Sequence, residues 1–243
     1  MSYDKEFELE RDFNLKNLKA NQKLNLERDD FFQNLVDAKY SYNFNWMGVP
    51  IIQMPGDLIV FQEIIYKVKP DIIVECGVAR GGSILFWSSM LELFHKEGIV
   101  IGVDIEIKNH TQEAINDSLF KHRIKLIEGD STDVSTLNKI KSLISKDKKV
   151  MIVLDSYHTE LHVLKELELY SQLVSTGSYL IVLDTVIEKL KAEKNRPWGP
   201  GDNPMTAVKR FMKGKSNVFE QDFDLELKSY LTVAPNGFYK KIK

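Results

Sequence analysis

Hydrophobic and polar positions along the chain fall into two alternating patterns from about residue 58 onward. Short continuous apolar runs, bounded by acidic or turn-forming residues, are typical of strands that are covered on both faces. Segments in which apolar residues recur every three or four positions are typical of amphipathic helices. The runs predict strands at 72–75, 99–104, 124–127, 150–155 and 179–184, and the periodic segments predict helices at 58–68, 83–96, 133–145, 159–173 and 204–213. This alternation predicts an α/β fold with a Rossmann-like, doubly wound and mostly parallel sheet.

Both ends of the chain depart from this pattern. Residues 1–40 are rich in charged side chains, with Leu and Phe at irregular helical spacing. They predict a helical N-terminal extension, which either covers the domain or another subunit, or closes over the substrate as a lid. Residues 40–57 combine aromatic side chains with Pro and Gly and are expected to form an ordered loop. The last 22 residues or so alternate around Pro235, Asn236 and Gly237, which predicts an antiparallel C-terminal hairpin at one sheet edge. We therefore expect an arm with an aromatic loop at 1–57 and one α/β domain at 58–243.

Composition narrows the class of protein. A chain of 243 residues, 43% of them hydrophobic, is long enough for one domain with a full core. The 33 basic and 35 acidic residues leave a net charge of -2, which argues against a nucleic-acid partner and favours a small-molecule substrate. The single cysteine, Cys76, excludes an internal disulfide and is expected to be a buried structural residue. Without a signal-peptide pattern or an apolar run of about 20 residues, we expect a cytoplasmic protein with no membrane span. The charged arm makes a homo-oligomer plausible.

One segment, DIIVECGVARGGSILFW at 71–87, predicts a strand, a glycine loop and a helix start in a single run. Gly77, Gly81 and Gly82 allow a sharp turn and a close approach of the backbone to a ligand. Ser83 lies where an N-cap residue is expected, and free N–H groups at a helix start favour an anionic ligand group. The glycine spacing differs from the G-x-G-x-x-G fingerprint of dinucleotide sites, which makes NAD the weaker choice of cofactor.

Acidic residues mark the carboxyl ends of all five predicted strands. They are Glu75, Asp104, Asp130, Asp155 and Asp184. Ligands of open α/β sheets bind beyond these strand ends, and clustered carboxylates repel one another unless a cation or hydrogen-bond donors offset their charge. Asp104 also follows the glycine loop at close to the spacing of about 20 residues at which an acidic side chain reaches a ribose hydroxyl. The strand ends therefore predict a site for a nucleoside cofactor.

The segments VECGVARGGS, IGVDI, EGDSTD, VLDSYHTELHVLKELELYSQLVSTGSYLIVLDT and WGPGDNPMTAV occur in this order. Over residues 40–240 the chain resembles the cephalosporin hydroxylase-like methyltransferases, a family that includes rhamnosyl O-methyltransferases. The resemblance implies a class I fold that binds S-adenosylmethionine, with a magnesium ion in the characterised type. It places Gly77, Arg80, Gly81 and Ser83 at the methionine end of the cofactor, in the loop that Glu75 precedes and Gly82 completes. It places Asp104 on the ribose, and Asp130 and Ser131 near the adenine.

Asp155 and Asp184 end what should be neighbouring strands, so that one ion could bridge them. Thr185 offers a hydroxyl as a further metal ligand, or else caps the next segment. Family members often have Glu-Asp-Thr at the end of this strand, whereas Leu183 stands in the first position here, which leaves the requirement for a metal open. His158, three residues beyond Asp155, corresponds to the lysine base of similar catechol-type enzymes; we assign it as the catalytic base alongside Asp155, against the alternative of a locally bonded helix-start residue.

Two further features concern the acceptor side. His162 is expected to be a packing residue, because the sequence HTELH lacks the spacing of the H-E-x-x-H metal motif. The loop at 196–204 is either a lid in which Trp198 or Arg196 contacts the acceptor, or a stiff connection to a helix capped by Asn203. We expect an S-adenosylmethionine-dependent O-methyltransferase that acts on a sugar, a glycan or a related small molecule. Two alternatives stay open: a hydroxylase, as the family name suggests, and a noncatalytic partner protein that binds S-adenosylmethionine.

Overall fold

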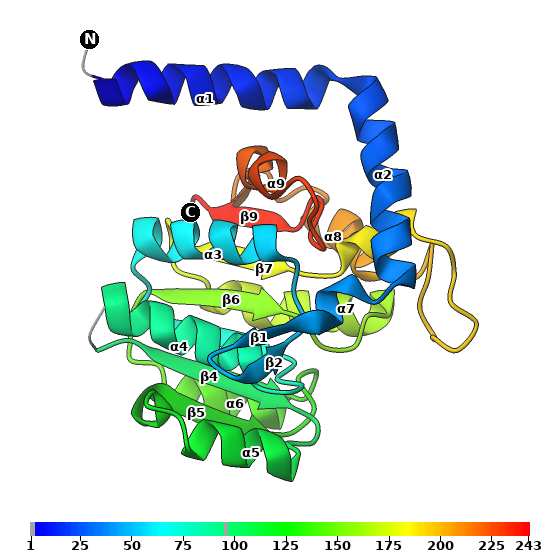
Figure 1. Ribbon diagram of the computed structural model, residues 1–243. Coiled ribbons are helices and arrows are strands. Elements are labelled where there is room, and N and C mark those ends of the chain that lie inside the picture. The colour runs from blue at the N-terminus through cyan, green and yellow to red at the C-terminus, as the bar shows by residue number, and fades with distance from the viewer. Residues whose placement is uncertain (1–2, 95–96) are drawn as a thin grey trace.

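The computed structural model describes residues 3–94 and 97–243, and its centre is a seven-stranded sheet (Figure 1). The strand order is β5-β4-β3-β6-β7-β9-β8, with parallel pairing from β5 to β7 and antiparallel pairing beyond β7. The strands are β3 (Ile72–Cys76), β4 (Ile99–Asp104), β5 (Ile124–Glu128), β6 (Val150–Leu154), β7 (Tyr179–Val182), β8 (Phe219–Gln221) and β9 (Phe238–Lys241). The chain winds outward on both sides of β3, so the order reverses there and opens a crevice at the carboxyl ends. The predicted doubly wound sheet is confirmed.

Helices cover both faces of this sheet because the strands are apolar on both sides. Ile73 packs into one core with helices α3, α4 and α5, whereas its neighbours Ile72 and Val74 pack into a second core with α6, α7 and α8. The helices are α3 (Pro55–Val68), α4 (Gly82–Phe94), α5 (Asn109–Asn116), α6 (Val134–Ser142), α7 (Glu160–Tyr170) and α8 (Pro204–Met212). Single-turn 3-10 helices lie at η1 (Tyr40–Asn43), η2 (Lys121–Arg123), η3 (Ser171–Leu173) and η4 (Thr185–Lys189). The five predicted helices are present with shifted ends, and the last residue expected for α4, Lys96, lies outside the described residues.

Two predicted helix caps have different outcomes. Asn203 caps α8 as expected, because its Oδ1 accepts from the N–H of Met205 at 2.8 Å and Pro204 occupies the first helical position. The prediction for Ser83 is wrong: α4 already begins at Gly82, and the Ser83 hydroxyl donates to Glu75 instead. A buried carboxylate next to the helix start outcompetes the capping role.

The C-terminal segment forms antiparallel strands, but not by the simple hairpin that the alternation suggests. Helix α9 (Phe223–Ser229) separates β8 from β9, and β9 inserts between β7 and β8. Asp222 starts this helix because its side chain accepts from the N–H of Leu225. The turn at Pro235, Asn236 and Gly237 therefore leads from a loop into β9. The expected antiparallel edge of the sheet is confirmed.

The N-terminal extension consists of two helices, α1 (Tyr3–Ala20) and α2 (Gln22–Asp37). In Figure 1, α1 is a long rod above α9, and α2 turns down toward the body of the molecule. Leu15 of α1 is buried, whereas Phe7, Leu9 and Phe13 remain more than half exposed. Among the described residues, no helix combines the length and the apolar character needed to span a bilayer.

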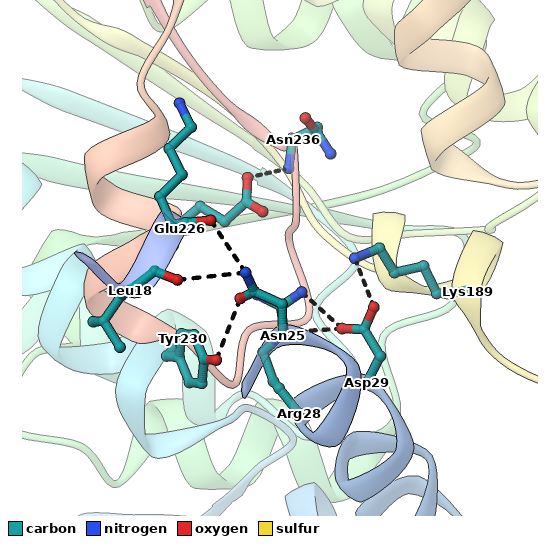
Figure 2. A network of polar contacts seen from close by, with 9 residues as sticks. Leu18, Asn25, Arg28, Asp29, Lys189, Glu226, Tyr230 and Asn236 are labelled. Carbon is teal, nitrogen blue, oxygen red and sulfur yellow. Dashed lines mark hydrogen bonds and ion pairs between the residues drawn. The ribbon is translucent and has the colours of Figure 1, made fainter. Parts of the chain in front are cut away.

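Polar contacts fasten α2 to the body (Figure 2). Asp29 accepts from Lys189 at 3.1 Å and also pairs with Arg28, and the Tyr230 hydroxyl donates to Asn25 at 3.3 Å. Phe32 adds an apolar contact to this arrangement, in a small cluster with Met54 and Val186. The arm therefore holds the segment that follows strand β7, which lies beside the predicted site.

The aromatic segment at 40–57 is more ordered than expected. Strands β1 (Phe44–Trp46) and β2 (Val49–Ile51) form an antiparallel hairpin. Met47 and Gly48 both have positive φ angles, of 50° and 86°, as a two-residue turn of type I′ requires. The Trp46 indole N–H donates to the Ser89 hydroxyl at 3.0 Å and its ring packs on Phe86, so the hairpin is fixed against α4. The expectation of a loop without strands is wrong because tertiary packing orders this short hairpin.

Candidate active site

Two glycines of the loop after β3 are required by neighbouring backbone. A Cβ atom on Gly77, whose φ is +97°, would lie 2.0 Å from the carbonyl oxygen of Asp155. A Cβ atom on Gly82 would lie 2.2 Å from the carbonyl oxygen of Pro50. Gly77 therefore lies against the end of β6, and Gly82 lies against the β1-β2 hairpin. Gly77 brings the cofactor loop into direct contact with the strand that carries Asp155.

Four amides of this loop, those of Gly77, Val78, Ala79 and Gly81, already have acceptors, whereas the expectation of free N–H groups at the helix start from Gly82 onward stays a prediction. Asp104, at the end of neighbouring strand β4, accepts from the N–H groups of Val78 at 2.8 Å and Ala79 at 3.1 Å through one carboxylate oxygen. The N–H groups of Gly77 and Gly81 donate to backbone carbonyls. The anion at the loop is therefore the protein's own Asp104, whose second oxygen receives only a longer bond of 3.3 Å from Glu106.

Glu75 lies behind the loop and is fully buried. Its two oxygens accept from the Trp87 indole at 3.1 Å and the Ser83 hydroxyl at 2.9 Å. Burial raises the pKa of Glu75 to about 7, because desolvation of the carboxylate outweighs the two hydrogen bonds. Glu75 thus anchors the first turns of α4 to the loop.

A cavity of about 350 Å³ opens at the carboxyl ends of β3, β4 and β6, within the size range of small-molecule sites. It is lined by Gly77, Ala79, Val103, Asp104, Ile105, Asp130, Ser131, Asp155, Ser156, Tyr157 and His162. The structure therefore brings together four of the residues predicted to bind the cofactor: Gly77, Asp104, Asp130 and Ser131. The other five, Glu75, Arg80, Gly81, Gly82 and Ser83, are outside this lining, and their role in cofactor binding stays a prediction.

One wall of the cavity is a polar network that sequence reasoning missed. His162 Nε2 lies 3.1 Å from the hydroxyl oxygens of both Ser131 and Ser156, and Ser156 donates to buried Glu166 at 2.6 Å. The expectation that His162 only packs is wrong, because α7 turns its ring toward the strand ends. Ser156 and Tyr157 could have been found from their position directly after Asp155.

The predicted catalytic and metal-binding side chains meet beside this cavity. Ligand atoms of Asp155, His158 and Asp184 all lie within 4.8 Å of one another. His158 Nε2 is 3.1 Å from a carboxylate oxygen of Asp184. The pKa of the Asp155 carboxyl is well above its usual value because the half-buried group is desolvated and faces the Asp184 carboxylate. A cluster of this kind is stable when a cation or a proton offsets its negative charge.

The donor set fits a divalent cation and includes two of the three ligands that the sequence suggested, Asp155 and Asp184. Thr185 is fully buried and donates its hydroxyl to the Pro235 carbonyl at 2.6 Å, and its role as a metal ligand stays a prediction. Leu183 points into the apolar core. His158 supplies the third donor atom, and two carboxylates with an imidazole suit a first-row divalent metal. Asp184 itself has a left-handed backbone, with φ of 54°, which is a strained conformation often found at functional sites.

The loop between β7 and α8 places an aromatic ring over this cluster. Trp198 makes edge-to-face contacts with His158, at 4.9 Å between ring centroids, and with Tyr157, at 5.2 Å. The Arg196 guanidinium lies 5.2 Å from the centre of the Trp198 ring. Glu188 anchors the base of the loop by accepting from the Gly201 N–H at 2.9 Å. These contacts favour the interpretation of the loop as a lid over that of a plain connection.

Gln53 is a further site residue without a local sequence signal. It follows the β1-β2 hairpin, its side chain is only 4% exposed, and its Nε2 donates to Asp155 at 3.1 Å. The two residues are far apart in the chain, so only the folded hairpin brings them together. An isolated Gln in an aromatic segment gives no reason to expect this contact.

The strand order and the cavity at its reversal point define a Rossmann-like class I methyltransferase. The sequence profile described as Rhamnosyl O-methyltransferase/CmcI matches residues 38–242, and the chain belongs to this family. The rhamnosyl O-methyltransferase of Mycobacterium tuberculosis (strain ATCC 25618 / H37Rv) is 29% identical over 209 residues, which cover 86% of this chain and 80% of the relative. That of Mycobacterium leprae is 29% identical over 196 residues, covering 79% and 81%.

Solved structures support the fold. The apo-structure of CmcI-N160 superposes with a TM-score of 0.61 at 17% identity, covering 83% of this chain and 77% of that one. The structure of cmcI-D160 with Mg and S-adenosylmethionine gives 0.57 at 18% identity, with coverage of 83% and 78%. An O-methyltransferase from Bacillus cereus in complex with S-adenosylhomocysteine gives 0.52 at 14% identity, covering 87% of each chain. The division of the chain at residue 57 stays a prediction.

Proposed function

We propose that this S-adenosylmethionine-dependent O-methyltransferase transfers the methyl group to a hydroxyl oxygen of a sugar or a related small molecule. The observation that carries the proposal is that Asp155 belongs both to the cavity lining and to the cluster with His158 and Asp184. A cofactor in the cavity and an acceptor at the cluster would therefore meet at one residue. The rhamnosyl O-methyltransferase relatives support a sugar as the acceptor.

The cavity would hold S-adenosylmethionine with its ribose toward Asp104 and its adenine toward Asp130 and Ser131. Asp104 has one carboxylate oxygen with only a long protein contact. The pKa of Asp130 is lowered by hydrogen bonds from the Thr132 side chain and backbone, so this group stays ionised near neutral pH. Gly77, at the mouth of the loop, leaves the methionine end facing Asp155.

In the transfer step, an acceptor oxygen attacks the methyl carbon, and the carbon–sulfur bond breaks with its electron pair passing to sulfur. The products are the methyl ether, S-adenosylhomocysteine and a proton. His158 would take that proton. The contact of its Nε2 with Asp184 supports this role, since a carboxylate partner orients the imidazole and stabilises the imidazolium. With Nε2–H bonded to Asp184, Nδ1 is the nitrogen left to accept a proton.

Asp155 and Asp184 would hold a divalent cation through their carboxylate oxygens, while His158 stays beside it as the base. When bound, such a cation polarises a hydroxyl oxygen and lowers its pKa. The donor set has one histidine and two carboxylates, which differs from the two-histidine, one-carboxylate set of iron oxygenases. The hydroxylase alternative therefore finds less support at this site than methyl transfer does.

Trp198 and Tyr157 supply the surface that would face a sugar ring. Both are partly exposed, and Trp198 lies directly against His158. Aromatic faces pack against the apolar C–H side of a sugar, while the hydroxyl groups on its other side stay available for polar contacts. The lid would thereby position one hydroxyl next to the reactive cluster.

Calorimetry with S-adenosylmethionine, and with NAD as the contrasting ligand, tests the cofactor. A methyl-transfer assay with radiolabelled S-adenosylmethionine and a panel of rhamnosides, other glycosides and catechols, each with magnesium and with chelator, tests the reaction. We expect heat only with S-adenosylmethionine and incorporation into a glycoside. Absence of binding would eliminate the proposal, whereas tight binding without transfer to any acceptor would favour a noncatalytic partner protein.

We further propose that the protein forms a homo-oligomer through α1, whose Phe7, Leu9 and Phe13 are exposed. Exposed aromatic and aliphatic side chains grouped on one element are typical of association surfaces. Light scattering of the wild type and of a Leu9→Ser, Phe13→Ser variant tests this, and a monomeric wild type would contradict it. The cytoplasmic location expected from the sequence stays a prediction.

A further inference from the structure

Gln53 combines two features that nothing in its own segment explains. Its side chain is 4% exposed, and only one of its two polar atoms has a partner. The amide nitrogen donates to Asp155 at 3.1 Å, while the carbonyl oxygen Oε1 is buried without a hydrogen bond to any of the described residues. A buried polar atom without a partner is costly to the folded state, so its retention calls for a reason.

The orientation of this amide follows from its neighbour. Rotating the amide by half a turn would bring Oε1 against the Asp155 carboxylate, which in its ionised, cation-binding form is also an acceptor, so that two acceptors would face each other. The observed orientation gives Asp155 a donor and leaves Oε1 available to accept from an O–H or N–H group. Since Oε1 and Nε2 share one carbon atom, Oε1 stays in the immediate surroundings of the Asp155 cluster.

Packing and hydrogen bonds fix the segment around Gln53, and they hold its side chain at the site. Ile51 is in the main core, and Met54 packs with Phe32 of the arm and with Val186 beyond Asp184. Asp57 accepts from the Ser229 hydroxyl at 2.6 Å and from the Val233 N–H at 2.9 Å, which ties the start of α3 to the C-terminal segment. The hairpin, the arm and the C-terminus together hold Gln53 against Asp155.

We propose that Gln53 is a positioning residue of the site: its N–H orients the Asp155 carboxylate, and its Oε1 receives an O–H donor that arrives with the substrates. The inference rests on the proposed function, which puts an acceptor and a cation at Asp155. Two sources can supply the O–H group, a hydroxyl of the acceptor sugar or a water molecule on the cation. Both share the same chemistry at Oε1.

Titration with Mn²⁺ followed by electron paramagnetic resonance tests the donor half of the proposal without cofactor or turnover. The variant is Gln53→Met, which keeps the length of the side chain and removes both polar atoms. Partners that orient a metal-binding carboxylate typically contribute about 10- to 100-fold to metal affinity, and we expect a loss in this range. Gln62→Met, on α3 and outside the site, is the matched control and should bind Mn²⁺ as the wild type does.

Gln53→Asn is the second variant, and it keeps the test possible if the Met variant does not fold. It keeps the amide but withdraws it by one methylene group, so Mn²⁺ affinity should fall in the same direction. The dissociation constant for S-adenosylmethionine should be unchanged in both variants. In an Asp155→Ala background, Gln53→Met should cause no further loss of Mn²⁺ binding, because Gln53 acts through Asp155.

Steady-state kinetics at saturating Mn²⁺ tell the two O–H donors apart. With methyl α-L-rhamnopyranoside as the probe, a rise of about tenfold in KM for Gln53→Met identifies the acceptor hydroxyl, and an unchanged KM identifies the water on the cation. Unchanged Mn²⁺ affinity together with unchanged KM in Gln53→Met would overturn the proposal. A wild type that binds Mn²⁺ but no S-adenosylmethionine would instead overturn the proposed function, so the two failures are distinguishable.

Discussion

The two halves of the candidate site are built in different ways. The cofactor half comes from successive strand ends, between Gly77 and Ser131, and its loop is held by backbone amides that donate to Asp104 and to carbonyl groups. The acceptor half draws Gln53, Asp155, Asp184 and Trp198 from separate segments, and contacts between side chains bring their functional groups together.

This difference has an energetic consequence. Contacts within the protein satisfy the amides of Gly77, Val78, Ala79 and Gly81 in the cofactor half before any ligand binds. The acceptor half keeps two facing carboxylates, a raised Asp155 pKa, a strained Asp184 and an unpartnered Gln53 oxygen. Groups held in such an unsatisfied state can interact more strongly with a reacting molecule, because no reorganisation is needed at that moment. The acceptor half should therefore govern the rate and the cofactor half the binding of S-adenosylmethionine.

The largest expected effect is that of Asp155→Ala, which tests this separation at the residue shared by both halves. Loss of one charge-stabilising group typically lowers kcat by about 10²- to 10³-fold. We expect a fall of this order, with the dissociation constant for S-adenosylmethionine nearly unchanged. Stopped-time radiolabel assays and calorimetry measure the two quantities. A variant that loses cofactor binding in proportion to its rate would show that the halves are not separable.

Gly77→Ala should disrupt the contact between the two halves, where Gly77 lies against the backbone of Asp155. The new Cβ would meet the Asp155 carbonyl oxygen at 2.0 Å, and neither backbone can move without disturbing the sheet. We expect a loss of about 3 kcal/mol or more in the free energy of unfolding, measured by urea titration. Gly81→Ala is the matched control: its φ is also positive, at +89°, but its nearest contact is a Thr111 methyl at 3.3 Å. A control as unstable as Gly77→Ala would assign the effect to φ strain and not to the contact.

The same difference explains how much the sequence could predict. The apolar runs and the acidic strand ends, among them the cavity residues Asp104 and Asp130, follow from local pattern, because each lies next to its own strand. Ser131 was expected only from the family resemblance. Gln53 and the ring of Trp198 over His158 depend on contacts between distant segments, which local pattern does not encode. Asp155 and Asp184 were predictable because neighbouring parallel strands must end side by side.

Each wrong prediction can be traced to a particular contact in the structure. Ser83 has the right residue type for a cap, but Glu75 offers its hydroxyl a buried carboxylate. In the C-terminal segment, alternating apolar residues suggest a strand, yet Asp222 caps the first turn of α9 and Leu225 still reaches the core.

Glu75→Gln tests the cofactor half, because Glu75 is the buried carboxylate of that half. A folded-state pKa of about 7, raised from 4.5, gives stability that is fully present below pH 4.5 and is lost as pH rises through 7. The Gln variant lacks this loss. From pH 5 to pH 8, the free energy of unfolding of the wild type should therefore fall by about 2–3 kcal/mol relative to that of the variant.

Urea titrations at pH 5 and pH 8 measure this shift, and Glu113→Gln, an exposed position on α5, serves as the control with no expected shift. Asp57, whose pKa burial raises to about 6, titrates in the wild type and in both variants and so cancels from the difference. Parallel pH dependence of wild type and Glu75→Gln would mean that the carboxylate is ionised in the folded protein throughout this range.

The smallest expected effect is that of Trp198→Ala, which removes the aromatic surface of the acceptor half without touching a charge. Aromatic packing contacts contribute about 0.5–1.5 kcal/mol beyond the area they bury, so KM for the acceptor should rise by up to about tenfold. Because Trp198 is absent from the cavity lining, the dissociation constant for S-adenosylmethionine should stay the same. Trp198→Phe should recover most of the loss. If both variants weaken cofactor binding and leave KM unchanged, the loop closes over the cofactor half, and the assignment of the lid to the acceptor is wrong.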